Sequence, residues 1–158
     1  MWDGTEWTEV PSTVTGTASS GSITTNSPVS DFSYRYFALG YKSIPKTYVP
    51  DDNFEAYLET HDASGNTVSV GDANSMGDGI ANNDYVTTSN ISGVSWLSLG
   101  SNVIGQNIAD LTGLEDFSSL TLFDIRNSLL TSINLGMHPQ LIQIGITDNN
   151  HITSVDIS

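Results

Sequence analysis

An apolar pattern that occurs twice between residues 120 and 158 constrains the fold of this chain more than any other feature. The first copy places apolar side chains at Leu120, Phe123, Ile125, Leu130, Ile133 and Leu135. The second copy places them at Leu141, Ile144, Ile146, Ile152, Val155 and Ile157. The offset is 21 residues at the start of the copies and 22 at their end. Apolar residues two positions apart share one face of a strand, so each copy predicts two short strands that must bury that face against a neighbouring copy.

The spacing matches the frame L-x-x-L-x-L-x-x-N, and on these residues the chain resembles the leucine-rich-repeat proteins that Gram-negative environmental bacteria secrete or carry on their surface. The resemblance rests on two repeats, LTLFDIRNSLLTSINL and LIQIGITDNNHITSVDIS, and on the preceding segments TYVPDDNFEAYLE, GDGIANNDYVTTSNI and ADLTGLEDFSSL. It covers about residues 46–158. The first copy departs from the frame, because Ser128 stands at the ninth position, where the second copy has Asn149. That Asn normally satisfies backbone groups in the turn, so a looser first turn is expected.

The resemblance implies an α+β fold dominated by a right-handed leucine-rich-repeat solenoid, with a short helical N-terminal cap and a β-rich segment before it. It divides the chain into a partly sandwich-like β segment (1–43), a linker (44–50), a cap helix with an Asx- and Gly-rich loop (51–93) and incomplete repeats without a C-terminal cap (94–158). Trp96, Leu97 and Leu99 are expected to occupy the position that Ile133 and Leu135 take in the next turn.

Residues 1–43 are expected to be all-β. Asp3-Gly4, between two tryptophans, is a strong hairpin signal. Five aromatic residues lie close together further on, at Phe32, Tyr34, Tyr36, Phe37 and Tyr41. About forty residues are too few for an independent sandwich, so these strands are expected to pack on the repeats, on another chain or on a further region. The aromatic residues are interpreted as packing residues, with a carbohydrate-stacking platform as the alternative.

A short helix is predicted from about residue 52 to Glu59. Asp52 has the residue type of an N-cap, and Glu55 follows three residues later, as in a capping box. The predicted apolar face of this helix consists of Phe54, Tyr57 and Leu58. Because the first turn of a stacked-repeat domain needs a cover, this face is expected to close its apolar end.

The charge balance narrows the class of partner. Lys and Arg total 4 against 18 Asp and Glu, which gives a formal net charge of −14 at pH 7. Such a field repels nucleic acids and anionic membranes, and favours cations or simply solubility. No apolar run approaches the roughly 20 residues that span a bilayer, so membrane insertion is not expected. The chain has no cysteine, which excludes disulfides, thiolate zinc sites and cysteine nucleophiles.

The N-terminal residues do not form a signal peptide, because Met1-Trp2-Asp3 is followed by neither a basic region nor an apolar stretch. The resemblance nevertheless implies an extracellular or cell-surface location. The chain is therefore expected to be a fragment of a longer protein.

The loop between residues 61 and 90 raises the question of a calcium site. Its oxygen-bearing candidates are Asp72, Asn74, Asp78, Asn82 and Asp84. An EF-hand loop needs oxygen ligands at positions one, three and five and a bidentate Glu at position twelve. Counted from Asp72, position five is Met76; counted from Asn74, position twelve is Tyr85, so neither register fits. The expected structure is a loop held by its own Asx side chains, with a different kind of Ca²⁺ site as the alternative. No other cofactor is expected.

No catalytic site is predicted. The three histidines, His61, His138 and His151, stand outside any recognisable zinc or nucleophile motif. Acidic neighbours such as Glu115 and Asp116 are adjacent along the chain and are expected to be solvated. The chain is therefore expected not to be an enzyme.

The outward positions of the repeat strands are the predicted ligand site. They are Leu122, Asp124, Arg126, Asn127, Gln143, Gly145, Thr147 and Asp148. Stacked strands would place them about 4.8 Å apart on one polar surface suited to binding a protein or a glycan. The predicted function is a non-catalytic interaction or adhesion module. The alternatives are a self-assembling structural subunit, joined through the open repeat edge or the N-terminal strands, and a glycan-binding module attached to a secreted enzyme.

Overall fold

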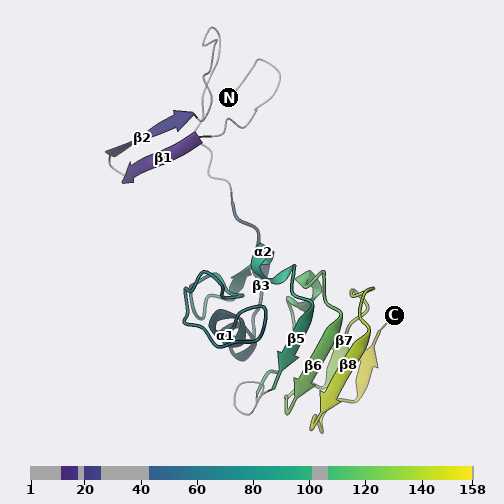
Figure 1. Cartoon of the computed structure of the whole chain (residues 1–158). Helices are drawn as coiled ribbons and strands as arrows, with labels where there is room; N and C mark the ends of the chain where they lie inside the picture. Colours follow the sequence, from purple (N-terminus) through teal and green to yellow (C-terminus); the bar gives the residue numbers. More distant parts are fainter. Residues whose placement is uncertain (1–11, 18–19, 26–42, 101–106, 158) are drawn as a thin grey trace. The chain divides into compact units, whose positions relative to one another are not determined.

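The computed structural model describes residues 12–17, 20–25, 43–100 and 107–157, which fall into two compact units, Met1–Ser43 and Ile44–Ser158 (Figure 1). In the first unit, β1 (Ser12–Thr17) and β2 (Ser20–Thr25) form an antiparallel pair with Ser12 opposite Thr25. The Asp3-Gly4 hairpin and the aromatic run from Phe32 to Tyr41, both expected from the sequence, lie outside the described residues.

The second unit contains short helices and strands joined by long loops. In chain order they are β3 (Lys46–Tyr48), α1 (Asp52–Thr60), β4 (Tyr85–Thr87), α2 (Thr88–Ile91), β5 (Trp96–Leu99), the 3₁₀ turn η1 (Leu114–Asp116), β6 (Leu122–Arg126), β7 (Ser132–Asn134), β8 (Gln143–Thr147) and β9 (Ser154–Asp156). β3 lies within the segment expected to be a linker and pairs antiparallel with β4. β5, β6 and β8 form one parallel sheet, and β7 and β9 form another.

The predicted leucine-rich-repeat solenoid is wrong. The described part of the second unit is a small mixed α/β fold with two α-helices and short strands in separate small sheets. Periodic pairing involves only two copies, whereas at least about three stacked repeats are needed for a stable core. The third strand of the sheet does not follow the period either, because Trp96 of β5 faces Leu122 at an offset of 26 residues. Leu122 in turn faces Gln143 of β8 at an offset of 21.

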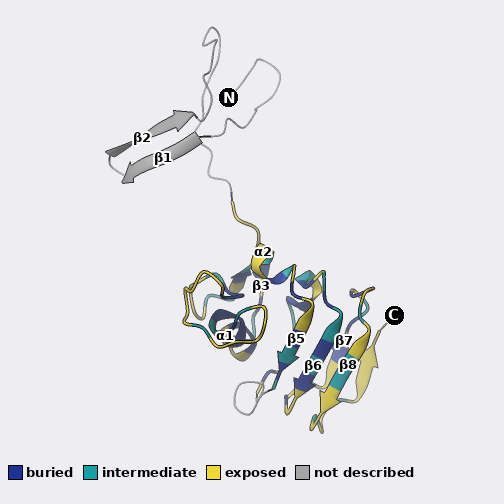
Figure 2. Ribbon diagram, in the orientation of Figure 1, coloured by how far each residue is buried: buried dark blue, intermediate teal, exposed yellow. Residues whose placement is uncertain are grey.

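The two copies of the apolar pattern nevertheless pair with each other as the sequence indicates. Leu122 lies opposite Gln143, and Ser132 lies opposite Ser154. The apolar residues of the first copy are all buried, but those of the second are half-buried or exposed, with Ile157 68% exposed. Figure 2 shows this change from β6, which is mostly buried or half-buried, to β8, which is half-buried or exposed. The second copy therefore covers the first without being covered itself.

β5 does not occupy the position expected for it. Trp96, Leu97 and Leu99 were predicted to correspond to Ile133 and Leu135, which belong to the return path of the repeat. In the structure, Leu97 and Leu99 are buried beside Phe123 and Ile125 of β6. β5 therefore extends the sheet of the first strand in each copy.

A continuous apolar core joins the helix to the sheets. Phe54 of α1 is fully buried and stacks on Phe117, with 6.3 Å between the ring centroids. Tyr57 and Leu58, the other residues of the predicted helix face, are buried in the same core. Because the core also includes Leu97 of β5, α1 and the three-stranded sheet share one apolar interior.

Asp51, and not the predicted Asp52, is the N-cap of α1. Its Oδ1 accepts hydrogen bonds from two backbone N–H groups of the first helical turn, both at 3.0 Å. Its Oδ2 accepts from the backbone N–H groups of Ala109 and Asp110, at 2.8 and 3.1 Å. One carboxylate therefore starts the helix and holds the segment that leads to η1.

Asn149 joins the turns that follow β6 and β8. Its Oδ1 accepts hydrogen bonds from the backbone N–H of Ser128 at 2.7 Å and from the Ser128 hydroxyl at 2.6 Å. Its Nδ2 donates to the carbonyl oxygens of Ile125 at 2.8 Å and Thr147 at 2.9 Å. Asn149 therefore supplies the bonds that the buried turn at Ser128 needs.

We expect Asn149→Ala to lower the free energy of unfolding by about 2–3 kcal/mol, because several hydrogen bonds to partly buried groups are lost together. Asn150→Ala is the matched control, because Asn150 is the exposed neighbour and its loss should cost less than about 0.5 kcal/mol. The measurement is chemical denaturation of both variants and the unchanged chain. Equal stabilities of the two variants would show that the hydrogen bonds of Asn149 make no net contribution to the free energy of unfolding.

Candidate functional site

On the face opposite the core, side chains of β5, β6 and β8 that lie opposite one another in the sheet form rows across the strands. The rows across the three strands are Trp96–Leu122–Gln143, Ser98–Asp124–Gly145 and Arg126–Thr147. Side chains alternate along a strand, so these positions point away from the buried residues between them. We call these eight residues the ligand face.

A pocket of about 230 Å³ opens on the ligand face. Five of the positions predicted to form the ligand site line it, namely Leu122, Asp124, Arg126, Gln143 and Gly145. Trp96 lines it as well. The structure therefore places most of the predicted ligand residues around one pocket, and the indole ring of Trp96 forms one side of it.

Asp124 is the polar centre of this pocket. Its Oδ2 accepts a hydrogen bond from the Ser98 hydroxyl at 3.3 Å. The same oxygen accepts a hydrogen bond from Nε of Arg126 at 3.1 Å and forms an ion pair with it. Its Oδ1 lies over Gly145, so close that a Cβ at that position would overlap it. The carboxylate can lean over β8 only because residue 145 has no side chain.

Trp96 was not predicted as a site residue. It is 59% exposed and occupies the same row as Leu122 and Gln143. Trp96 was not expected at this site because β5 was predicted to correspond to the return strand of the repeat, whereas it pairs with β6. The alternation Trp-Leu-Ser-Leu matches Leu-Phe-Asp-Ile at 122–125, and this match was the available signal.

The remaining predicted ligand residues lie away from this pocket. Asn127 and Asp148 occupy equivalent turn positions, with φ of 54° and 56°. They line a separate pocket of about 170 Å³ that also includes His151. Thr147 is exposed opposite Arg126 in the sheet and lines neither pocket.

The five oxygen-bearing residues of the loop do not converge on one point. Oδ1 of Asp72 accepts from the backbone N–H and the side-chain amide of Asn74, at 2.8 and 3.1 Å. Oδ2 of Asp78 pairs with Nζ of Lys46 at 2.7 Å. Asn82 and Asp84 have positive φ angles, 57° and 63°, which the turn requires. These contacts are those of a loop held by its own side chains.

Two buried carboxylates of α1 complete the anchoring of this loop. Glu55 does not form the predicted capping box; its Oε1 and Oε2 instead accept from the backbone N–H groups of Asn83 and Asp84, at 3.0 and 3.1 Å. Glu59, one helical turn later, accepts from the backbone N–H groups of Asp78 and Gly79. Burial raises the pKa of Glu59, although these N–H groups act in the opposite direction.

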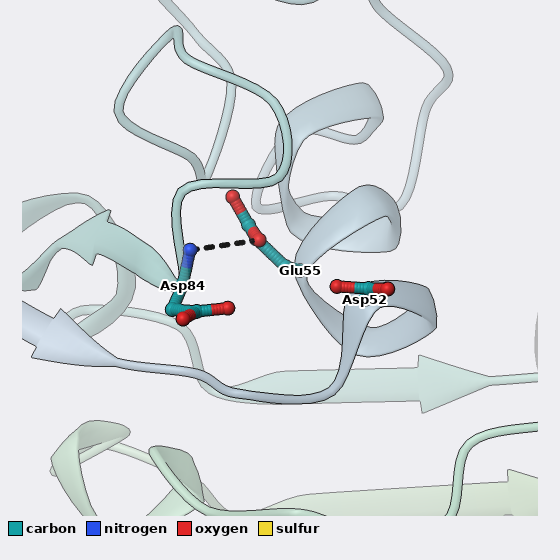
Figure 3. A group of neighbouring side chains, drawn as sticks. All are labelled: Asp52, Glu55 and Asp84. Carbon is teal, nitrogen blue, oxygen red and sulfur yellow. Dashed lines mark hydrogen bonds between the residues drawn. The ribbon is translucent and has the colours of Figure 1, made fainter.

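Asp52, Glu55 and Asp84 form the one carboxylate cluster within the described residues that has metal-binding spacing (Figure 3). An oxygen of each lies within 4.8 Å of the others. Such oxygens are ligands of the kind that Ca²⁺ takes. Figure 3 also shows the bond from the Asp84 N–H to Glu55, which gives that carboxylate a structural role independent of any cation. A Ca²⁺ site therefore stays a prediction, and only Asp84 of the five predicted residues belongs to this cluster.

The histidines are separate from one another and from the pocket of the ligand face. His61 is buried and stacks on Tyr57, with 4.1 Å between the ring centroids. His138 is buried, and burial lowers its pKa, so its imidazole is neutral near pH 7. His151 is exposed and lines the pocket at Asn127. This arrangement offers the pocket of the ligand face no imidazole base.

Comparison of the chain with protein-family models, with curated protein sequences and with solved structures found no match. Within the described ranges, no helix is long and apolar enough to cross a membrane. The function therefore has to be inferred from the residues of the site.

Asp78 provides a test of how the loop is anchored. Burial acts to raise the pKa of Asp78, but hydrogen bonds from Lys46, Asn83 and the backbone N–H of Ile80 together lower it below its usual 3.8. Its contribution to stability is therefore present above pH 3.8 and lost as the pH falls through the lowered pKa. We expect Asp78→Asn to cost about 1–2 kcal/mol at pH 7 and progressively less below pH 4, measured by denaturation across pH.

Asp72→Asn is the matched control for this experiment. Asp72 is exposed, and Asn keeps an oxygen that can accept the same backbone N–H. Its effect should be small at every pH. A loss from Asp78→Asn that did not change with pH would show that its charge plays no part.

Proposed function

We propose that this chain is a non-catalytic binding module whose ligand, a protein or a glycan, is held on the ligand face. The observation that carries this proposal is the pocket in which Trp96, Asp124, Arg126 and Gln143 surround one opening. It combines an exposed aromatic ring with a carboxylate, a guanidinium and an amide. Ligand pockets combine aromatic and apolar side chains with a small number of polar groups that orient the ligand.

Binding without catalysis fits the chemistry of these residues. Oδ2 of Asp124 already accepts hydrogen bonds from the Ser98 hydroxyl and from Nε of Arg126, and these contacts fix the position of the carboxylate. A hydroxyl nucleophile such as that of Ser98 is usually activated by a base such as imidazole, and none of the residues that line this pocket is a histidine. The described groups of the pocket orient and recognise a ligand instead.

We further propose that the module belongs to a secreted or cell-surface bacterial protein, in which it serves adhesion or docking. The formal charge of −14 supports solubility outside the cell and disfavours nucleic acids and anionic lipids as partners. The ligand is therefore expected to be uncharged or cationic as a whole.

The labelled chain, applied to arrays of neutral glycans, anionic glycans and synthetic peptides, tests this function. We expect at least one class of ligand to bind, and the double variant Asp124→Ala with Arg126→Ala to weaken that binding about tenfold or more. Asp72→Asn changes an exposed position in the loop between α1 and β4, and this variant should bind the ligand as the unchanged chain does. Binding that survives the double variant, or no binding to any array, would overturn the proposal.

Self-assembly is a second candidate function, and one observation favours it. Four exposed apolar side chains lie on the outer strands β8 and β9 or directly beside them, namely Ile142, Ile146, Val155 and Ile157. A sheet edge of this kind can pair with another copy of the chain. We call these four residues the β8–β9 edge.

Light scattering after size exclusion, over a wide concentration range, tests assembly. If the β8–β9 edge mediates it, the mass should rise above 16.9 kDa with concentration, and Val155→Lys should return the monomer. Ile80→Lys is the control, because Ile80 is similarly exposed but lies in the loop between α1 and β4. A monomer of the unchanged chain at every concentration would rule this function out.

A further inference from the structure

We propose that the pocket of the ligand face binds a neutral oligosaccharide built of gluco-type pyranoses, one ring of which stacks on Trp96. This inference rests on the proposed function and names the class of ligand. It is carried by the exposure of Trp96, the set of polar groups beside it, the local charge balance and the size of the pocket.

Trp96 supplies a flat apolar surface that the fold does not cover. Its side chain is 59% exposed, while its strand neighbours Leu97 and Leu99 are fully buried. In a gluco-type pyranose the hydroxyl groups are equatorial, so each ring face carries axial C–H bonds and is apolar. Such a face covers an indole ring well, and contact removes apolar surface from water on both partners.

The polar groups around Trp96 suit hydroxyl groups, each of which both donates and accepts a hydrogen bond. The Asp124 carboxylate accepts, the Arg126 guanidinium donates, and the exposed Gln143 amide does both. The ion pair between Asp124 and Arg126 uses Nε, which is one of several donors of the guanidinium. The apolar face of a pyranose can therefore stack on Trp96 while its hydroxyl groups form hydrogen bonds with the polar side chains beside it.

The charge of the site favours a neutral ligand. Asp124 and Arg126 form an ion pair with 3.1 Å between their atoms, so their charges largely cancel within the pocket. The chain as a whole carries a formal charge of −14, which repels uronates, sulfated sugars and nucleotides. A base stacked on Trp96 would bring a phosphate into this field, and a neutral sugar would not.

The size of the pocket favours a short unit of a longer chain over a protein. Its volume of about 230 Å³ is below the roughly 300–1,000 Å³ of pockets that enclose drug-sized ligands, so one ring fits. A protein partner would need on the order of 800 Å² of complementary surface, which this small opening does not supply by itself. The site therefore matches one residue of an oligosaccharide.

The test is a titration of the ¹⁵N-labelled chain with cellohexaose, followed by NMR. We expect the indole N–H signal of Trp96 and the amide signals of Ser98, Asp124 and Gly145 to shift together. The Trp96 indole signal is the one that Trp96→Phe removes. Polygalacturonate should cause no such shifts, because it is anionic.

Variants measure the contribution of the stacking contact. Trp96→Ala should raise the dissociation constant for cellohexaose about tenfold, and Trp96→Phe, which keeps a smaller ring, should raise it less. Tyr85→Ala is the matched control, because Tyr85 is also an exposed aromatic residue but lies on β4. The amide spectrum of each variant shows that it is folded.

The outcomes separate this inference from the proposed function. Shifts confined to the ligand face and lost with Trp96→Ala support both. Peptide binding on the arrays that depends on Asp124 and Arg126, with no response to cellohexaose, would overturn the inference and leave the proposed function standing. Cellohexaose shifts that Trp96→Ala does not change would overturn the stacking site.

Discussion

The structure depends most on acidic side chains that accept hydrogen bonds from the backbone N–H groups of loops. The helices and strands among the described residues are short, so many loop N–H groups there need another acceptor. The α1 region supplies three of them: Asp51 holds the segment at residues 109–110, Glu55 the turn at 83–84 and Glu59 the turn at 78–79. One short helix and its N-cap residue therefore hold three loop segments in place.

This use of carboxylates changes the meaning of the acidic composition. From charge alone, the acidic residues indicated either cation binding or solubility. In the structure, Asp62, Asp72, Asp78 and Asp110 each accept at least one backbone N–H in their own turns. These carboxylates are part of the fold itself, because they accept hydrogen bonds from loop N–H groups that no helix or strand satisfies. These bonds give the acidic residues of the loop a structural role whether or not the loop also binds a cation.

The ligand face has a different origin. It arises where strands from three parts of the chain meet in parallel register, so that Trp96, Asp124 and Gln143 approach one another although they are far apart in sequence. The shared core beneath, with Leu97 and Phe123 buried, keeps these strands in place. The buried apolar residues thus fix the positions of the Asp124–Arg126 ion pair and of the exposed Trp96 indole at the surface.

Patterns in the amino-acid sequence were enough to predict the pairing of the two copies, the apolar helix face at Phe54, Tyr57 and Leu58, and five residues of the pocket. The sequence could predict these features because strand alternation and helix periodicity are local patterns. It did not determine the fold class, since two copies with one exposed side do not extend into a solenoid. Nor did it determine the N-cap Asp51, the bonds of Glu55 and Glu59, or the place of Trp96. Those depend on which distant backbone groups and strands come into contact, and only the tertiary structure decides that.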